Sequence, residues 1–223
     1  MDFEDVGVVI PAYNAEKTIG GLIEELVDYG FKRGNIIVIN DGSKDRTCKA
    51  AEGGGVSVVN HKKNMGKGVS LRHGFDAARE KNLKKVFTLD ADGQHRVSEI
   101  TNFFNHEDRY DIIIGVRNSV VGMPFLRRVV NRTTSLVVSL FAKKYIPDAQ
   151  SGFRCIDLKI FDEVRLKTNN YQTESELIVK TARHRYPIGF VPITTIYNNE
   201  RSYIKPLIDT LKFMKMAIGF LWR

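Results

Sequence analysis

The spacing of hydrophobic residues changes repeatedly along the first half of the chain. VGVVIPAY at 6–13 is an almost continuous apolar run, whereas residues 15–29 carry apolar side chains at helical spacing, from Ile19 to Val27. A short apolar run is typical of a strand buried on both faces, and the i, i+3, i+4, i+7 spacing is typical of an amphipathic helix. The pattern therefore predicts a strand followed by a helix, with Asn14 as a suitable helix cap.

The same alternation continues to about residue 117. It predicts further strands at 35–41, 56–60, 85–92 and 111–117, and helices at 45–52, 67–81 and 97–107. Strands that are apolar on both faces and separated by helices indicate a parallel sheet covered on both sides. We therefore predict an α/β fold with a Rossmann-like, mostly parallel central sheet flanked by helices.

The second half has a different order of elements. It predicts a basic and apolar helix at 125–144, the loop PDAQSGFR, a helix at 174–185 and a strand at 188–197. Because no low-complexity linker separates the halves, we predict one domain over 1–203, with halves of about 1–118 and 119–203. The tail 204–223 is predicted to form an amphipathic C-terminal helix.

Two segments suit a membrane surface. KPLIDTLKFMKMAIGFLWR at 205–223 combines an apolar face with lysines and Trp222, which is typical of an interfacial helix, although packing on the sheet explains it equally well. For 124–146 the packed interpretation is favoured. Since no apolar run is long enough to span a bilayer and the N-terminus is acidic, we expect an intracellular protein with peripheral attachment.

Composition and charge narrow the classes of ligand that the protein is expected to bind. The 223 residues carry a formal net charge of +8, which favours anionic ligands such as nucleotides, phosphates or a membrane surface. The basic residues are dispersed and lack an aromatic platform, which argues against nucleic acid. Cys48 and Cys155 do not form a CxxC pair, so the sequence has no zinc or redox motif of that kind.

Polar clusters follow four of the predicted strands: PAYN, NDGSKDRT, LDADGQ and GVRN. Ligands of open α/β sheets bind beyond the carboxyl ends of the strands, so these clusters predict one site. NMGKG at 64–68 adds a glycine-rich turn with Lys67 before a helix, which is a weak signal for phosphate binding.

Asp90 and Asp92 carry the most specific chemistry. If strand geometry holds through Ala91, the two carboxylates face the same way and repel each other unless a cation lies between them. Hard oxygen ligands suit Mg²⁺ or Mn²⁺, which also bind substrate phosphates, and Gln94 adds a neutral oxygen. The pair therefore implies a diphosphate ligand. His95 is either a further ligand or a turn residue.

These motifs together resemble a known family. VVIPAYNAEKTI, VINDGSKDRT, NMGKG, LDADGQH, GVR and DAQSGFR, in this order, are similar to the family 2 glycosyltransferases with the GT-A nucleotide-sugar-binding fold. Within that family, the chain resembles the polyprenyl-phosphate monosaccharide synthases, such as dolichyl-phosphate mannosyltransferases. The resemblance extends from about residue 6 to 212.

The resemblance implies a role for each matching residue. The donor would be bound by Pro11, Tyr13, Glu16, Asp41, Lys67, Asp90, Arg117 and Arg201. The metal ligands would be Asp90, Asp92 and Gln94. The acceptor would be bound by Arg128, Arg132, Ser135, Asp148, Gln150, Ser151 and Arg154. The catalytic residues would be Asp92, Arg117 and Arg132.

The implied reaction is metal-dependent, inverting transfer of a sugar from a nucleotide diphosphate sugar to polyprenyl or dolichyl phosphate. GDP-mannose is the favoured donor and UDP-glucose the alternative. A phosphate acceptor is already largely ionised at neutral pH, so it needs positioning by arginine more than a general base. The alternative acceptor is a saccharide hydroxyl, for which Asp148 would be the base. We expect the enzyme at the cytoplasmic face of the membrane, held peripherally or by a membrane-anchoring partner subunit.

Overall fold

A computed structural model of the chain describes residues 3–106, 108–118 and 125–195, together with Phe213 and Met216; for 125–127 only the backbone is described. Seven strands form one sheet. They are β1 (Val6–Ala12), β2 (Ile36–Asn40), β3 (Ser57–Asn60), β4 (Lys85–Thr88), β5 (Ile112–Arg117), β6 (Arg154–Asp157) and β7 (Ile188–Ile193). Their order is β3-β2-β1-β4-β6-β5-β7. β6 runs antiparallel to β4 and β5, and the other pairings are parallel.

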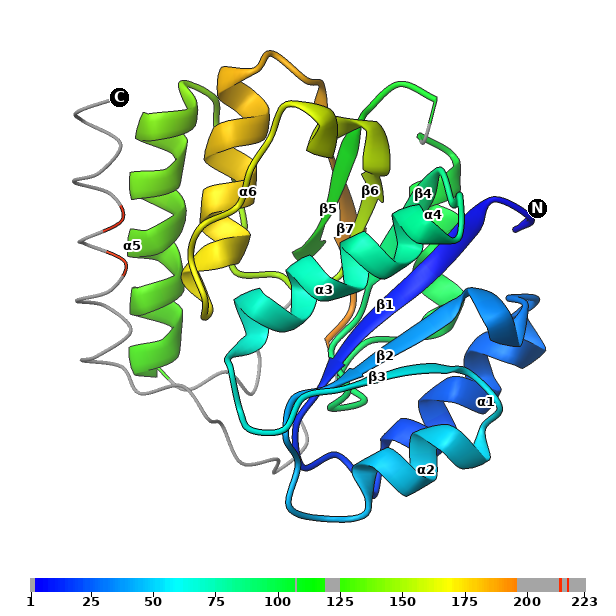
Figure 1. Cartoon of the computed structure of the whole chain (residues 1–223). Helices are drawn as coiled ribbons and strands as arrows, with labels where there is room; N and C mark the ends of the chain where they lie inside the picture. Colours follow the sequence, from blue (N-terminus) through cyan, green and yellow to red (C-terminus); the bar gives the residue numbers. More distant parts are fainter. Residues whose placement is uncertain (1–2, 107, 119–124, 196–212, 214–215, 217–223) are drawn as a thin grey trace.

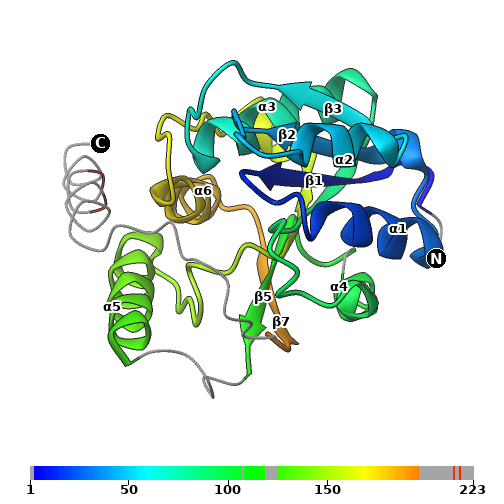
Figure 2. The same ribbon diagram turned by 90° about the horizontal axis from the view of Figure 1, so that it is seen from below.

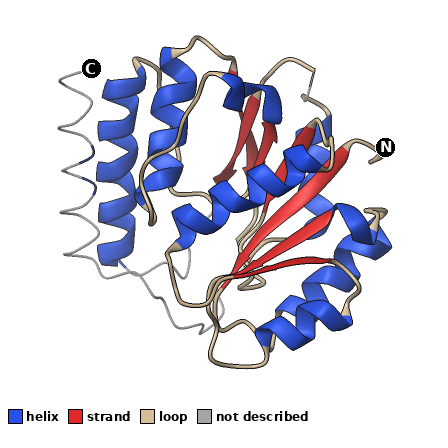
Figure 3. Cartoon of the chain, in the orientation of Figure 1, coloured by secondary structure: helices blue, strands red, loops and turns tan. Residues whose placement is uncertain are grey.

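Helices cover both faces of this sheet (Figures 1 and 3). They are α1 (Ile19–Tyr29), α2 (Thr47–Gly53), α3 (Lys67–Glu80), α4 (Ile100–Phe104), α5 (Phe125–Ala142) and α6 (Gln172–Arg183), with short 3₁₀ turns at Arg33–Asn35, Val97–Glu99 and Leu158–Asp162. Alternate strand residues supply two cores. Val8 and Ile10 pack with α1, α2 and α4, whereas Val9 packs with α3, α5 and α6. The two-sided core is the reason why the strands read as unbroken apolar runs.

This architecture confirms the predicted α/β fold with a mostly parallel sheet. Figure 2 shows α3 on one side of β1 and α1 on the other. Several local predictions were wrong. Asn14 does not cap α1, because the helix begins at Ile19 and Asn14 adopts a left-handed φ of 51°. Its side-chain oxygen instead accepts a hydrogen bond from the backbone of Lys44, 2.9 Å away.

Two further differences concern the site. β6 was not predicted. Its first residue, Arg154, ends the expected loop PDAQSGFR, and the strand Arg154–Asp157 fills the gap between β4 and β5. β4 ends at Thr88, so Asp90 and Asp92 belong to the turn after the strand and do not share a strand face.

The membrane-related segments are described only in part. None of the described helices combines the length and apolar character needed to cross a bilayer. Phe213 and Met216 pack against the core formed by α3, α5 and α6. The remainder of the predicted tail helix, including its proposed apolar face, lies outside the described residues, as does Arg201.

Candidate active site

The loops after β1 and β2 are joined by hydrogen bonds. The backbone N–H groups of Asn14 and Ala15 donate to the hydroxyls of Ser43 (3.0 Å) and Thr47 (2.7 Å). The Glu16 carboxylate accepts from the backbone N–H of Arg46 at 3.0 Å. Pro11 and Tyr13 lie half-buried at the end of β1, next to these loops, and we call the surface formed by Pro11, Tyr13 and Glu16 the wall of the site. The predicted donor-binding residues of the first two strands therefore lie in one connected structure.

Asp41, at the end of β2, is almost fully enclosed. One carboxylate oxygen accepts from His61 Nδ1 (2.7 Å) and the Met65 N–H (2.8 Å), and the other accepts from the Gly66 N–H (2.9 Å). His61 Nε2 lies 2.8 Å from His73 Nδ1. Asp41 therefore anchors the segment 61–66. The family resemblance implies that Asp41 binds the donor, and no sequence motif had pointed to His61 or His73.

The antiparallel strand β6 brings the SGFR segment to the aspartates. Thr88 is in register with Arg154, and its hydroxyl donates to the Gly152 carbonyl at 2.7 Å. A Cβ atom at Gly152 would lie 2.5 Å from Asp90 Oδ2. Because such a contact is shorter than van der Waals separation allows, only glycine lets this backbone approach the Asp90 carboxylate so closely.

Asp90 shares the ammonium group of Lys67 with Glu174. Lys67 Nζ lies 2.6 Å from Asp90 Oδ1 and 3.1 Å from Glu174 Oε1. Burial alone would lower the pKa of Lys67, but the charges of Asp90 and Glu174 outweigh it and raise that pKa. Burial raises the pKa of Glu174. Burial also acts to raise the pKa of Asp90, but the charge of Lys67 and the hydrogen bond from its ammonium outweigh burial and lower that pKa. Lys67 thus stays charged, and sequence reasoning had missed Glu174.

The rest of the DADGQH turn is compact. The Asp92 carboxylate accepts the Gln94 N–H at 3.0 Å, which closes the turn. His95 is buried against Phe153, with ring centroids 5.3 Å apart. Burial lowers the pKa of His95 to about 4, so the imidazole is neutral at pH 7. Its Nδ1 and the Ser151 hydroxyl have no hydrogen-bond partner among the described residues.

The donor set fits a hard divalent cation. No group of three or more histidine, cysteine or acidic side chains in the described parts of the chain is arranged to hold a metal. The Asp90–Asp92 pair with Gln94 nevertheless supplies the oxygen ligands that Mg²⁺ prefers, since this ion usually binds one or two carboxylates, waters and substrate phosphates. In this structure the Lys67 ammonium lies against one of the Asp90 carboxylate oxygens.

Arg117 and Asp148 form a buried bidentate pair. Arg117 Nε and Nη2 donate to the two carboxylate oxygens of Asp148 at 2.7 and 2.9 Å. Both side chains are largely buried. The pair joins the end of β5 to the segment after α5, so two residues predicted in different halves of the chain lie in contact. Arg117 is oriented by this partner, and the Asp148 carboxylate is occupied by it.

The other predicted acceptor residues divide into two groups. Arg128 and Arg132 lie on the exposed side of α5. Ser135 is buried and accepts the Ala149 N–H at 3.0 Å, and the Gln150 amide lies 3.4 Å from the Thr134 hydroxyl. Ser135 and Gln150 therefore fix the 148–151 segment against α5, whereas the arginines face solvent.

Arg154 does not fit the predicted contact with an acceptor. It is fully buried, and its guanidinium donates to the carbonyls of Ala149, Ser151 and Glu174 at 2.9–3.0 Å. Arg154 therefore organises the SGFR segment and the start of α6 from inside. The sequence alone could not distinguish an arginine directed at a ligand from one directed at backbone carbonyls.

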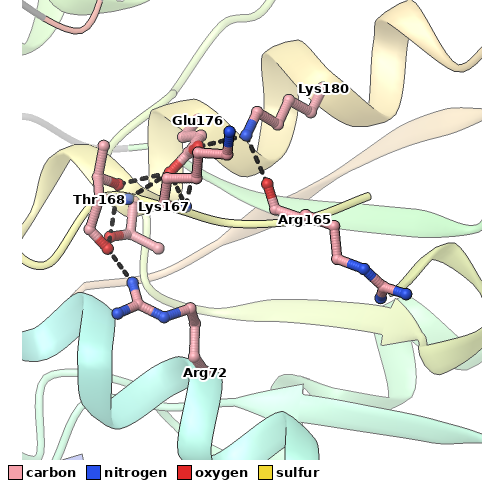
Figure 4. A network of polar contacts seen from close by, with 7 residues as sticks. Arg72, Arg165, Lys167, Thr168, Glu176 and Lys180 are labelled. Carbon is pink, nitrogen blue, oxygen red and sulfur yellow. Dashed lines mark hydrogen bonds and ion pairs between the residues drawn. The ribbon is translucent and has the colours of Figure 1, made fainter. Parts of the chain in front are cut away.

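The glycine-rich turn at the start of α3 also packs against other parts of the protein. The Gly68 N–H donates to the Asn169 carbonyl at 3.0 Å, and a Cβ at Gly68 would lie within 2 Å of the Thr173 hydroxyl, at 1.9 Å. Figure 4 shows how the 165–169 segment is held: Glu176 accepts from Lys180 and from the backbone of Thr168, and Arg72 donates to the Thr168 carbonyl. Gly68 therefore allows close packing of the start of α3 against 169–173.

Comparisons with known proteins agree with this geometry. The family model "Glycosyl transferase family 2" matches residues 7–165. The chain belongs to glycosyl transferase family 2. A relative of this glycosyltransferase, the UDP-N-acetylglucosamine–dolichyl-phosphate N-acetylglucosaminyltransferase of Methanococcus voltae, is 31% identical over 85% of this chain and 85% of its own length. The dolichyl-phosphate hexose transferase of Haloferax volcanii is 27% identical, over 86% of this chain and 82% of its own.

The fold of the glycosyltransferase is also found in solved structures. Glucosyl-3-phosphoglycerate synthase from Mycobacterium tuberculosis, crystallised with Mn²⁺, UDP and glucosyl-3-phosphoglycerate, superimposes with a TM-score of 0.73. The alignment covers 97% of this chain and 78% of that one at 19% identity. This likeness confirms the predicted GT-A fold.

Proposed function

We propose that this glycosyltransferase transfers a sugar from a nucleotide diphosphate sugar to a polyprenyl phosphate such as dolichyl phosphate, with inversion and with Mg²⁺ or Mn²⁺. The observation that carries the choice of acceptor is the Arg117–Asp148 pair. A hydroxyl acceptor needs a general base within reach of its proton. Asp148, the candidate for that task, is buried with both oxygens bound to Arg117. A phosphate acceptor needs no such base.

Each residue of the site has a task in this reaction. The wall formed by Pro11, Tyr13 and Glu16 receives the nucleoside. Asp90 and Asp92, with Gln94, would hold the metal, which when bound neutralises charge on the leaving diphosphate. Arg117, held in one orientation by Asp148, faces the phosphates. Its fixed position stabilises developing negative charge without reorganisation during the reaction.

The acceptor headgroup is assigned to Arg128 and Arg132. Guanidinium groups bind phosphate oxygens in a planar, bidentate manner, and both residues lie on the exposed side of α5. The two dolichyl-phosphate transferases among the relatives support a lipid phosphate acceptor. The Methanococcus voltae relative is named for UDP-N-acetylglucosamine, which favours a UDP-sugar as donor. The preference for GDP-mannose that follows from the sequence remains a prediction.

The decisive assay measures transfer of labelled sugar to polyprenyl phosphate. UDP-N-acetylglucosamine, UDP-glucose and GDP-mannose are supplied in turn, with Mn²⁺ or Mg²⁺ and with chelator. We expect a lipid-linked product with inverted anomeric configuration, and no product in the presence of chelator. The rate of product formation should fall at least 100-fold in Asp92→Asn, because loss of one metal ligand weakens stabilisation of the transition state. Lys81→Met, an exposed change at the far end of α3, is the control. Product formation with a saccharide but never with the lipid would refute the proposal.

We further propose that α5 rests on the cytoplasmic membrane surface. Leu136 and Leu140, one helical turn apart, are 62% and 69% exposed, and Tyr145 follows at 79%. Arg128 and Arg132 flank this apolar stripe. An apolar stripe with basic neighbours suits an anionic lipid surface, where each basic residue contributes about 1 kcal/mol.

Vesicle flotation tests this surface. Vesicles containing phosphatidylglycerol should bind the protein, whereas vesicles of phosphatidylcholine alone should bind it weakly. Leu136→Ser with Leu140→Ser should lower binding at least tenfold, since burying one leucine contributes roughly 1.5–3 kcal/mol. Met65→Ser, which changes an exposed apolar residue outside α5, is the control. Unchanged binding of the double variant would assign membrane contact to another part of the chain. The same assay with an added membrane protein fraction tests the predicted anchoring partner.

A further inference from the structure

The Lys67 ammonium lies between two carboxylates with different surroundings. Lys67 is the first residue of α3, and its Nζ is 2.6 Å from Asp90 and 3.1 Å from Glu174. The Asp90 side chain is 28% exposed, whereas that of Glu174 is only 7% exposed. Asp90 therefore faces the side from which a ligand arrives, and Glu174 lies behind the ammonium.

The cluster is electrically balanced as it stands. Lys67 and the buried Arg154 face the charges of Asp90 and Glu174. Arg154 cannot take over as the ion-pair partner of either acid without breaking its hydrogen bonds to three backbone carbonyls. Lys67 is the mobile cation of the cluster, because an ammonium on a flexible four-carbon stem carries three donors that turn freely between acceptors.

A divalent cation at Asp90 conflicts with this ammonium. Two cations sharing one carboxylate oxygen repel each other strongly at such separations, even at an effective dielectric constant near 20. Metal binding therefore requires the ammonium to leave Asp90 Oδ1. Glu174 provides the place for it, since a shift of the ammonium toward Oε1 keeps the buried charge of Lys67 paired.

We propose that Lys67 and Glu174 set the affinity of the Asp90–Asp92 pair for divalent metal: the Lys67 ammonium competes with the metal for Asp90, and Glu174 retains the ammonium when the metal binds. This inference rests on the metal dependence proposed above. It gives Lys67 a role that neither the glycine-rich turn nor the donor phosphates required, and it makes Glu174 a positioning residue of the site.

The test is direct titration of the purified full-length protein with Mn²⁺, with free Mn²⁺ followed by electron paramagnetic resonance. Lys67→Met removes the competitor, so the dissociation constant should fall about tenfold. Glu174→Gln leaves the ammonium with Asp90 as its only anionic partner in the cluster, so the constant should rise about tenfold. Lys81→Met, at the exposed C-terminal cap of the same helix, should bind like the wild type.

Opposite changes of the Mn²⁺ dissociation constant in the two variants distinguish competition by Lys67 from a purely structural role of the cluster. If the cluster only maintained the fold, both variants would weaken Mn²⁺ binding, and that result would overturn the inference, as would two unchanged constants. The double variant Lys67→Met with Glu174→Gln guards against a misfolded single variant, because it removes one positive and one negative charge and so keeps the net charge of the cluster. It should bind Mn²⁺ as tightly as Lys67→Met. Thermal melting accompanies each titration. A wild type that binds no Mn²⁺, with or without UDP, would refute the metal dependence itself.

Discussion

Gly152 offers a sharp test of how the SGFR segment supports the aspartates. An added Cβ would lie 2.5 Å from Asp90 Oδ2 and 2.9 Å from its Cγ, about 1 Å inside ordinary van der Waals contact. Gly152→Ala must therefore move the carboxylate or the backbone of β6. Moving the carboxylate strains its 2.6 Å contact with Lys67, and moving the backbone strains the 2.7 Å bond from Thr88 to the Gly152 carbonyl.

Overpacking of this kind costs about 1–3 kcal/mol of unfolding free energy. For a chain of this length each kcal/mol lowers Tm by about 2–4 °C, so we expect a decrease of roughly 2–12 °C. Displacement of a metal ligand by about 1 Å should lower kcat/KM for sugar transfer about 10–100-fold. Calorimetry and the labelled-sugar assay measure the two effects. Gly20→Ala is the matched control, since nothing lies within 4 Å of its added Cβ. Wild-type activity in Gly152→Ala would refute the proposed tight support of Asp90.

Three other predictions concern buried polar groups. Arg154→Met should lower unfolding free energy by about 3–5 kcal/mol in urea denaturation, because three carbonyls lose their donor and Glu174 loses a neighbouring charge; a loss below 1 kcal/mol would contradict the assignment. The pKa of Glu176 is lowered, since hydrogen bonds from Lys180 and Thr168 outweigh burial. The ionised Glu176 carboxylate therefore stabilises the fold at pH values above its ordinary pKa of 4.5, and this stabilisation is lost as the pH falls through the lower pKa of the folded state. Glu176→Gln should flatten the pH dependence of Tm in that acidic range. An unchanged pH dependence would argue against this role of Glu176. Asp148→Asn should reduce kcat/KM at least tenfold without changing the pH profile of kcat, because Asp148 positions Arg117 and does not accept a substrate proton. Loss of the acidic limb of that profile, where a base becomes protonated, would restore Asp148 as a general base.

The sequence predicted the fold where local pattern and tertiary environment agree. The strands β1 to β5 are apolar on both faces because helices cover both, and that pattern is visible residue by residue. β6 escaped prediction because Arg154–Asp157 is only four residues long and follows a polar loop. Its strand conformation comes from pairing with β4 and β5, which lie more than 35 residues away in sequence. Such non-local pairing overrides local preference.

The sequence indicated which residue types form the site more than which side chains each of them contacts. Asp90, Arg117 and Asp148 all lie within electrostatic range of His95, because the sheet brings their segments to one edge. The roles of these residues toward donor and acceptor stay predictions. Glu174 was missed, although a signal exists: it stands three and four residues before Leu177 and Ile178, on the buried face of α6. An acid on an apolar face requires a counter-ion. Which cation supplies it depends on the start of α3, more than 100 positions earlier.

The position of β6 also has a consequence for folding. β5 joins the rest of the sheet through β6, has β7 on its other side, and is not adjacent to β4, although β4 precedes it in the chain. Strands β1 to β4 can assemble during synthesis, but β5 has no place beside them until residue 157 has emerged. Closing this loop late raises the contact order and places a slow, non-local step at the end of folding. The strand that connects the two parts of the sheet is β6, which begins at Arg154, two residues after Gly152, and so brings both residues toward Asp90. A partly folded chain therefore lacks the assembled site, and nucleotide-sugar binding reports completed folding.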